Sequence, residues 1–171
     1  MSNGCRRHRV TPNPLRSLSV DAIDLSLVDL LRGNARLSYA ELARQVGLSA
    51  PAVHERVGKL ESNGVIRGYR ADVAPESIGL GVTALIGIVE DSGADSDDML
   101  ESLRVLPEIE SCYFMAGVES FLLKARVGTI AELEQLIVRL NRTPGVASTR
   151  TAIALSTKWE NRPQPVGQPP A

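Results

Sequence analysis

Hydrophobic residues recur at helical spacing in three short runs between residues 18 and 66. The first run opens with Asp21 as an N-cap and Asp24 three residues later. Gly33 and Asn34 follow its last apolar position, so the pattern predicts a helix that ends there. Its inward face consists of Ile23, Leu27, Leu30 and Leu31.

The second and third runs are separated only by a short turn. Ser38 and Glu41 form a Ser-x-x-Glu capping box that starts the second helix, and Gly47 ends it. Ser49 caps the third helix, and Gly64 ends it. Two short helices joined in this way are typical of a helix-turn-helix. The predicted inward residues are Tyr39, Leu42, Ala43 and Val46, then Val53, Val57 and Leu60.

After these helices the hydrophobic pattern changes its period. It predicts the element order strand, helix, strand, strand, helix, strand. The expected strands are 81–89, 109–116, 121–127 and 146–157, and the expected helices are 96–106, capped by Ser96, and 129–140, with a capping box of Thr129 and Glu132. LRVLPEIESC and LNRTPGVAST share Leu-x-x-x-Pro-x-[Ile/Val]-x-Ser, so each half ends a helix and starts a strand. This repeat predicts a ferredoxin-like βαββαβ arrangement with both helices on one sheet face.

Consecutive apolar residues in ALIGIV and FLL indicate strands that are covered on both faces. Two helices on one face leave the other face open. A second copy of the chain is the simplest cover, so we expect self-association.

The predicted fold class is α+β, with an N-terminal (winged) helix-turn-helix domain and a C-terminal ferredoxin-like βαββαβ sandwich. The expected organisation is a flexible basic arm at 1–17, a helix-turn-helix domain at 18–66, a linker strand or hinge at 67–79, a ligand-binding and oligomerisation domain at 80–157, and a disordered Pro/Gly/Gln-rich tail at 158–171.

Charge and composition restrict the classes of function and the location that fit the chain. Residues 1–73 carry 11 Lys/Arg against 7 Asp/Glu, while residues 74–171 carry 8 against 13, so the front half is the part suited to a polyanion. Two distant cysteines and two histidines give no disulfide framework, zinc site or catalytic triad. Without a membrane-length apolar run or an export signal, a reducing cytoplasm is the expected location.

The outward face of the third helix has small side chains. On a helical wheel Pro51, Glu55, Gly58 and Ser62 lie opposite the core, with Ala52, His54 and Lys59 beside them. In a helix-turn-helix the second of the two helices enters the major groove, and small residues allow it to approach base edges closely. From the residues alone, a solvated flank without contact to nucleic acid stays an equal alternative.

Two stretches carry a family resemblance. The turn AELARQVGLS, followed by ERVGKLESNGVI and the pair Gly68 and Tyr69, resembles the N-terminal segment of the Lrp/AsnC (leucine-responsive or feast-famine) regulators. CYFMAGVESFLLKARV followed by TPGVASTRT resembles their ligand-binding domain. The resemblance spans residues 18–157.

The resemblance implies a transcriptional regulator that binds double-stranded operator DNA, pairs through its sheets into dimers, forms octamers, and binds a free amino acid where dimers meet. It implies no other cofactor. The implied DNA-binding residues are Ser38, Tyr39, Ser49, Ala50, Pro51, Ala52, His54, Glu55, Arg56 and Lys59. The implied effector residues are Gly117, Val118, Glu119, Ser120, Thr149 and Thr151.

Two positions depart from the family pattern. Ser120 stands where family members often have an Asp suited to the ammonium group of the ligand, and Glu119 is the candidate replacement. Gly58 stands where a second basic residue is common, which removes one phosphate contact. The loop is also consistent with a plain strand connection in which Gly117 supplies backbone freedom.

The leading hypothesis is a sequence-specific DNA-binding regulator of amino-acid metabolism with an amino-acid effector. The alternative is an oligomeric effector-sensing partner module with weak or no DNA binding, which the near-neutral third helix favours. An enzyme is not expected, because the candidate strands show no clustered acid, base and nucleophile.

Overall fold

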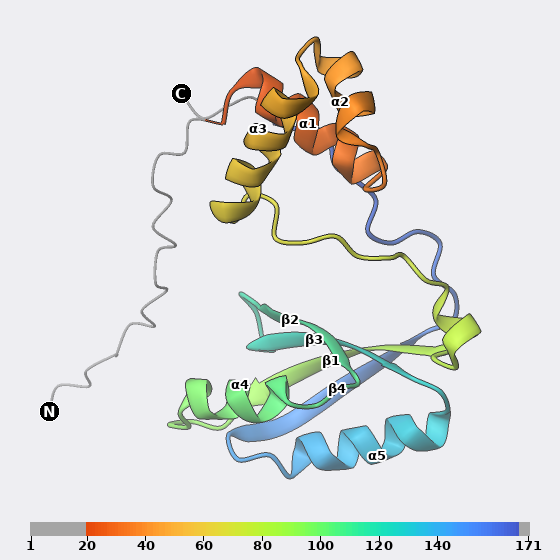
Figure 1. The fold of residues 1–171 in the computed structure, drawn as a ribbon. Helices are drawn as coiled ribbons and strands as arrows, with labels where there is room; N and C mark the ends of the chain where they lie inside the picture. The colour runs from red at the N-terminus through yellow and green to blue at the C-terminus, as the bar shows by residue number, and fades with distance from the viewer. Residues whose placement is uncertain (1–19, 168–171) are drawn as a thin grey trace, which may run out of the picture. The chain divides into compact units, whose positions relative to one another are not determined.

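Two separate hydrophobic cores form in the chain, one among three helices and one between a sheet and its two helices. The computed structural model describes residues 20–167. They divide into one unit that runs to Arg70 and resumes at Asn161, and a second unit of residues 71–160 (Figure 1). The expected basic arm at 1–17 and the last four residues of the expected tail lie outside the described part of the chain.

Three helices build the first unit: α1 (Ala22–Gly33), α2 (Tyr39–Val46) and α3 (Ala50–Ser62). α1 starts at a complete capping box, in which Asp21 accepts from the backbone N–H of Asp24 and Asp24 accepts from that of Asp21. The apolar faces meet in a core of Leu27, Leu31, Leu42, Ala43, Val53, Val57 and Leu60.

The turn between α2 and α3 depends on a glycine in the left-handed region. Gly47 has φ 70° and ψ 30°, a conformation that L side chains with a Cβ rarely adopt. Its N–H donates to the carbonyl of Ala43, and Ser49 then caps α3 by accepting from the N–H of Ala52. The short turn predicted between the second and third helices is therefore present, and it joins α2 and α3 compactly.

Two expectations for this unit were wrong. Tyr39 was placed on the inward face of α2, but its side chain is 40% exposed, and its ring packs edge-on against His54 with centroids 4.9 Å apart. The segment 67–79, expected as a linker strand or hinge, contains no strand and pairs with none of the four strands of the sheet. It includes a single 3-10 turn, Pro75–Ile78.

A four-stranded antiparallel sheet builds the second unit and confirms the predicted α+β class. Its strands are β1 (Val82–Glu90), β2 (Ile109–Phe114), β3 (Phe121–Val127) and β4 (Val146–Ala154), in the spatial order β2-β3-β1-β4. α4 (Ser96–Arg104) precedes β2, and α5 (Ile130–Asn141) precedes β4. The element order and strand order are those of the split βαβ fold.

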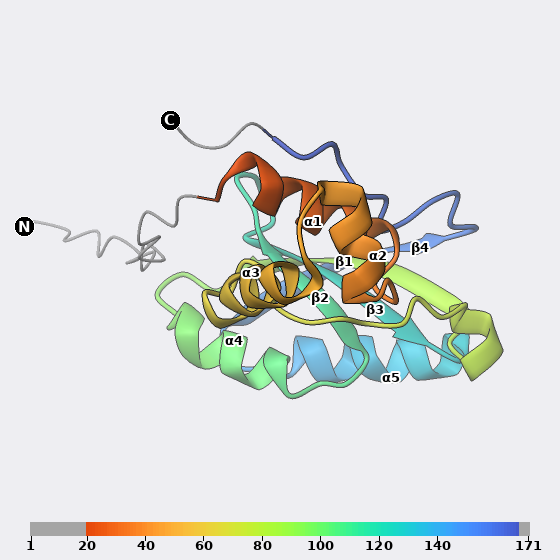
Figure 2. The ribbon, with the colours of Figure 1, turned by 45° about the horizontal axis from the view of Figure 1, so that its top comes forward.

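Both helices cover the same face of this sheet (Figure 1, Figure 2). Alternate strand residues such as Ile86 and Leu123 pack against Leu103 and Leu136 of the helices, and all four are buried. The cap of α4 differs from the prediction, because Asp95 accepts from the N–H of Asp97 while the Ser96 hydroxyl donates to Glu90.

The opposite face of the sheet carries a charged cluster instead of a second helical layer. Lys124 of β3 lies at 8% exposure, and its Nζ is 2.8 Å from Oε1 of Glu110. Arg126 pairs with Oε2 of the same Glu110 at 2.7 Å, and both cations also pair with Glu160. Glu160, in the segment expected to be disordered from residue 158, is thus anchored to β3.

Candidate functional site

The exposed side of α3 carries four of the ten residues proposed to bind DNA. Val53, Val57 and Leu60 face the core, which leaves Pro51, His54, Glu55, Gly58 and Lys59 exposed on the outside, as the wheel predicts. A Cβ built on Gly58 would meet nothing within 4 Å. The open space around Gly58 therefore allows DNA to approach the backbone of α3 closely.

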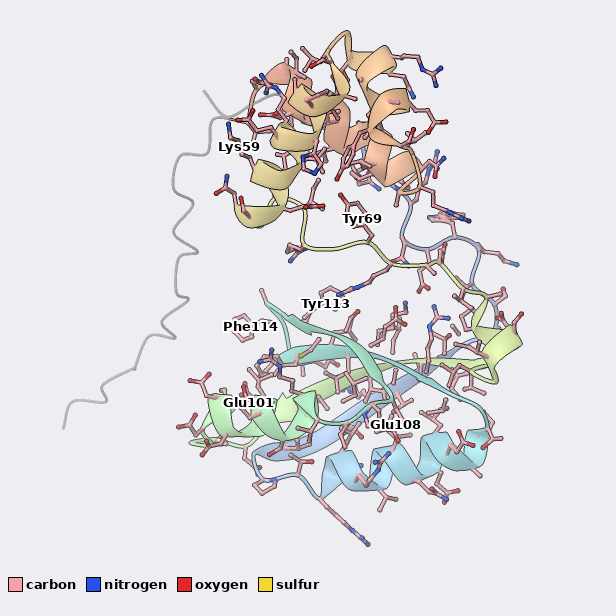
Figure 3. All side chains as sticks on the ribbon, viewed as in Figure 1. Lys59, Tyr69, Glu101, Glu108, Tyr113 and Phe114 are labelled. Carbon is pink, nitrogen blue, oxygen red and sulfur yellow. The ribbon has the colours of Figure 1, made fainter. Side chains whose placement is uncertain are left out.

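Lys59 projects from this side (Figure 3) and is paired with Glu55 one turn earlier, with Nζ 2.7 Å from Oε1. Both side chains are 68% exposed. The hydrogen bond from Lys59 lowers the pKa of Glu55, so the carboxylate is charged at neutral pH. Such an exposed i, i+4 pair is weak, and Lys59 can exchange Glu55 for a phosphate.

Arg56 points to a different place. Its Nη1 lies 2.7 Å from Oδ2 of Asp21 and 2.7 Å from Oδ1 of Asp24, both at the start of α1. The N–H of Asp24 and the Arg56 guanidinium lower the pKa of Asp21, and the two carboxylates raise the pKa of Arg56. The proposed DNA contact is thus engaged within the protein, where it joins α3 to α1.

The remaining proposed DNA residues gather at the N-terminal ends of α2 and α3. Ser38 and Ser49 are the two N-caps, and Ala50 and Ala52 are half-buried beside Pro51 in the first turn of α3. The ring contact between Tyr39 and His54 links these two ends. Apart from Arg56, the proposed set therefore forms one connected surface across the α2–α3 turn.

Further cations lie in the same unit. Arg36 before α2 and Arg44 on α2 are exposed and make no ion pair with any residue between 20 and 167. The same holds for Arg67 and Arg70, which flank Tyr69 in the segment after α3. From the sequence, Arg36 and Arg44 were expected to neutralise phosphates, whereas Arg67 and Arg70 were not identified, although the basic balance of the front half includes them.

Tyr69 was identified only as part of a motif, and its contact was not foreseen. Its hydroxyl donates to Oε1 of Glu61 at 2.8 Å. Burial, together with this bond to a carboxylate, raises the pKa of Tyr69 to about 12. The bond ties the segment after α3 to the last turn of that helix, a contact that spacing alone does not reveal.

The proposed effector residues 117–120 form the connection between β2 and β3. Gly117 and Val118 are exposed, while the backbone of Ser120 is fixed by two bonds of 2.8 Å, donating to the carbonyl of Ile88 and accepting from the N–H of Met115. Oε1 of Glu119 lies 3.2 Å from Nη1 of Arg150 on β4. The Glu119–Arg150 ion pair therefore connects the β2–β3 loop to β4.

Thr149 and Thr151 do not join this loop within one chain. They pair in register with Ile88 and Ile86, whose side chains lie in the core on the helix-covered face, and Thr149 accepts from the amide of Asn141. Glu119 lies on the other face. Within one chain the loop and these two threonines therefore lie on opposite faces of the sheet.

Gly87 of β1 was not proposed from the sequence. It pairs with Arg150 on one side and Leu122 on the other, and a Cβ built on it would lie 2.6 Å from Cγ of Glu119. The missing side chain therefore makes the space in which Glu119 lies. Glycine within a strand is the signal that marks such a close approach.

Other kinds of site find no support in the described residues. No group of three or more His, Cys, Asp and Glu residues between 20 and 167 is arranged to hold a metal ion. None of the helices in this part of the chain has the length and apolar character needed to cross a bilayer.

Two family models match the chain in the order of its two units. An AsnC-type helix-turn-helix domain matches residues 20–61, and an Lrp/AsnC ligand-binding domain matches residues 83–164. The first match covers α1 to α3, and the second covers the sheet, both of its helices and the segment that contains Glu160.

Similar proteins are transcriptional regulators. The HTH-type transcriptional regulator LrpA of Mycobacterium tuberculosis is 40% identical over 144 residues, which cover 84% of this chain and 95% of that protein. The regulatory protein AsnC of Escherichia coli K12 is 35% identical over 80% of this chain and 90% of its own. A feast or famine regulatory protein from M. tuberculosis, solved in complex with L-methionine, has a TM-score of 0.81 at 39% identity and covers 86% of this chain and 99% of that one.

Proposed function

The chain belongs to the Lrp/AsnC family of transcriptional regulators, and we propose that it is a sequence-specific DNA-binding regulator of amino-acid metabolism that responds to an amino acid. The observation that carries the proposal is the connected α2–α3 surface, with small side chains where a groove approaches and exposed cations around it.

Affinity comes from phosphate neutralisation by Lys59 and the unpaired arginines, Arg36 and Arg44 first. Specificity comes from the first turn of α3 and from the shape of the groove, because Pro51, Ala52 and Gly58 offer little hydrogen bonding to base edges. His54 and Ser49 are the polar groups of this set best placed to contact bases or adjacent phosphates.

The regulator acts as an oligomer. The helix-free face of the sheet exposes Leu85 and Tyr113 and has no second layer in the described part of the chain. A second copy covers this face, and dimers assemble further into an octamer. Paired α3 helices then reach successive major grooves when they stand about 34 Å apart.

The effector is a free amino acid bound between dimers by residues 117–120 of one copy together with Thr149 and Thr151 of another. The L-methionine complex of the M. tuberculosis relative supports this chemical class. An amino acid that binds one assembly state more tightly than another shifts the spacing of the α3 pairs, and by linkage DNA then changes the affinity for the amino acid.

Fluorescence anisotropy with labelled duplexes tests the proposal. We expect the purified chain to bind its own upstream region at least about tenfold more tightly than a scrambled duplex at one salt concentration, with log K falling linearly as log[salt] rises. Sedimentation in the same buffer should give a dimer or larger species. A flat salt plot or a lone protomer would overturn the proposal.

The same titration discriminates between this proposal and a second candidate function, an effector-sensing partner module. The pairing of Lys59 with Glu55 favours this candidate, because it leaves the outer face of α3 nearly neutral. Equal and weak binding to both duplexes, with an intact oligomer, would establish the partner module instead.

A further inference from the structure

The Glu119–Arg150 pair has the charge pattern of an α-amino acid in reverse. A free amino acid presents one ammonium group and one carboxylate on the same carbon, and this pair presents one carboxylate and one guanidinium at 3.2 Å. Each charge of the ligand thus finds its complement, and each new contact is a charge-assisted hydrogen bond.

We propose that Arg150 binds the carboxylate of the amino-acid effector, and that Glu119, seated over Gly87, holds Arg150 until the effector takes its place. The inference rests on the proposed function, which supplies the ligand class, and adds two residues to that site. Arg150 and Gly87 belong to strands, so the receptor combines a loop with the sheet under it.

Within a single chain the Glu119–Arg150 pair is exposed and weakly held. The Arg150 side chain is 73% exposed and that of Glu119 is 31% exposed, so water competes for both charges. The guanidinium presents several parallel N–H donors to a carboxylate, and a single 3.2 Å contact to Glu119 leaves most of these donors available. An arriving carboxylate can therefore engage Arg150 in a two-bond geometry.

Gly87 sets where the carboxylate of Glu119 lies. A Cβ at this position would lie 2.6 Å from Cγ, 3.4 Å from Cβ and 3.5 Å from Cδ of Glu119, so the middle of that side chain would have to move. Gly87→Ala thus displaces Glu119 without removing either charge. Gly81→Ala is a matched control, because a Cβ there meets nothing within 4 Å and its backbone has no positive φ.

Calorimetric titration of the full-length oligomer with the twenty standard L-amino acids, each tested singly, gives the tightest binder. The α-amide and the N-acetyl derivative of that amino acid then test the two charges separately. We expect wild type to bind each derivative at least about tenfold more weakly than the free amino acid.

The variants assign each preference to a residue. Arg150→Gln should abolish the preference over the amide, and Glu119→Gln the preference over the N-acetyl derivative. Gly87→Ala should weaken binding of the free amino acid, while Gly81→Ala should leave it unchanged. Sedimentation of all four variants is measured alongside, because Arg150 and Glu119 lie on the sheet face that a second copy covers, and the binding comparison uses variants that keep the wild-type oligomer.

The outcomes separate the two proposals. If a free amino acid binds Arg150→Gln as tightly as wild type, the receptor inference is overturned while the regulator keeps its effector. If no free amino acid binds wild type, the inference and the proposed effector are both overturned, and salt-dependent DNA binding alone still supports the regulator.

Discussion

Arg56 on α3 donates to Asp24 on α1 over 2.7 Å, and the Asp24 side chain is only 14% exposed. The same guanidinium reaches Asp21, the N-cap of α1, so one side chain of the third helix binds both carboxylates of the capping box of the first. The residue beside it on the outer surface, Glu55, contacts Lys59 instead. Neighbouring charges on α3 thus serve different purposes, one within the fold and one at the surface.

The first prediction separates these roles. Arg56→Gln should reduce the free energy of unfolding by about 1–2 kcal/mol, because two carboxylates lose a charged donor. It should leave the slope of log K against log[salt] for DNA unchanged. Urea unfolding and anisotropy on the same samples measure both quantities, and a lower salt slope with unchanged stability would assign Arg56 to phosphate.

The second prediction concerns Lys59. Lys59→Gln should lower the magnitude of the DNA salt slope by about 1 and leave the unfolding free energy within about 0.5 kcal/mol of wild type. Arg104→Gln is the control, because Arg104 also forms an exposed helical ion pair, with Glu101 in the other unit. If both variants change the slope equally, the effect reflects net charge and not the α3 surface.

The third prediction uses two glycines of the helix-turn-helix. Gly47→Ala should destabilise the protein by about 1 kcal/mol or more, because Gly47 has φ 70°. Gly58→Ala should stabilise it by up to about 1 kcal/mol, because Gly58 lies inside α3 with open space around a new methyl group. Thermal unfolding measures both changes, and equal effects would contradict the assignment of the turn.

Short-range features of the fold were predictable from the sequence because they depend on residues three or four positions apart. The caps Asp21, Ser38 and Thr129 each accept from an N–H three residues later. The cap of α4 shows the limit of this reasoning. Asp95 and Ser96 are both good caps, and Glu90, a residue of the preceding strand, engages the Ser96 hydroxyl.

The parts of the site that sequence reasoning missed depend on residues distant in the chain. Arg56 and Asp21 are 35 positions apart, and Arg150 and Glu119 are 31 apart. Helical periodicity places Arg56 on a flank of α3, but it gives no information on where α1 lies relative to that flank. Likewise, the role of Gly87 becomes visible only when the strand register sets it beside the loop at Glu119.

The fourth prediction is a pH dependence from the charged cluster on the sheet. Burial alone would raise the pKa of Glu110, but hydrogen bonds from Lys124 and Arg126 outweigh it and lower the pKa below its ordinary 4.5. A carboxyl group whose pKa is lower in the folded state binds fewer protons there than in the unfolded state. Its stabilisation is therefore fully present above pH 4.5 and is lost as the pH falls through the folded value.

Glu110→Gln should test this directly, because Glu160 still pairs with Lys124 and Arg126 in the variant. At pH 7 we expect a loss on the order of 1 kcal/mol, a modest value because the Glu110 side chain is 38% exposed. Urea unfolding from pH 7 to pH 3 should show the wild-type and variant curves converging below pH 4.5. A difference that stays constant across this range would mean that the charge of Glu110 does not stabilise the sheet, and that the variant acts only through packing.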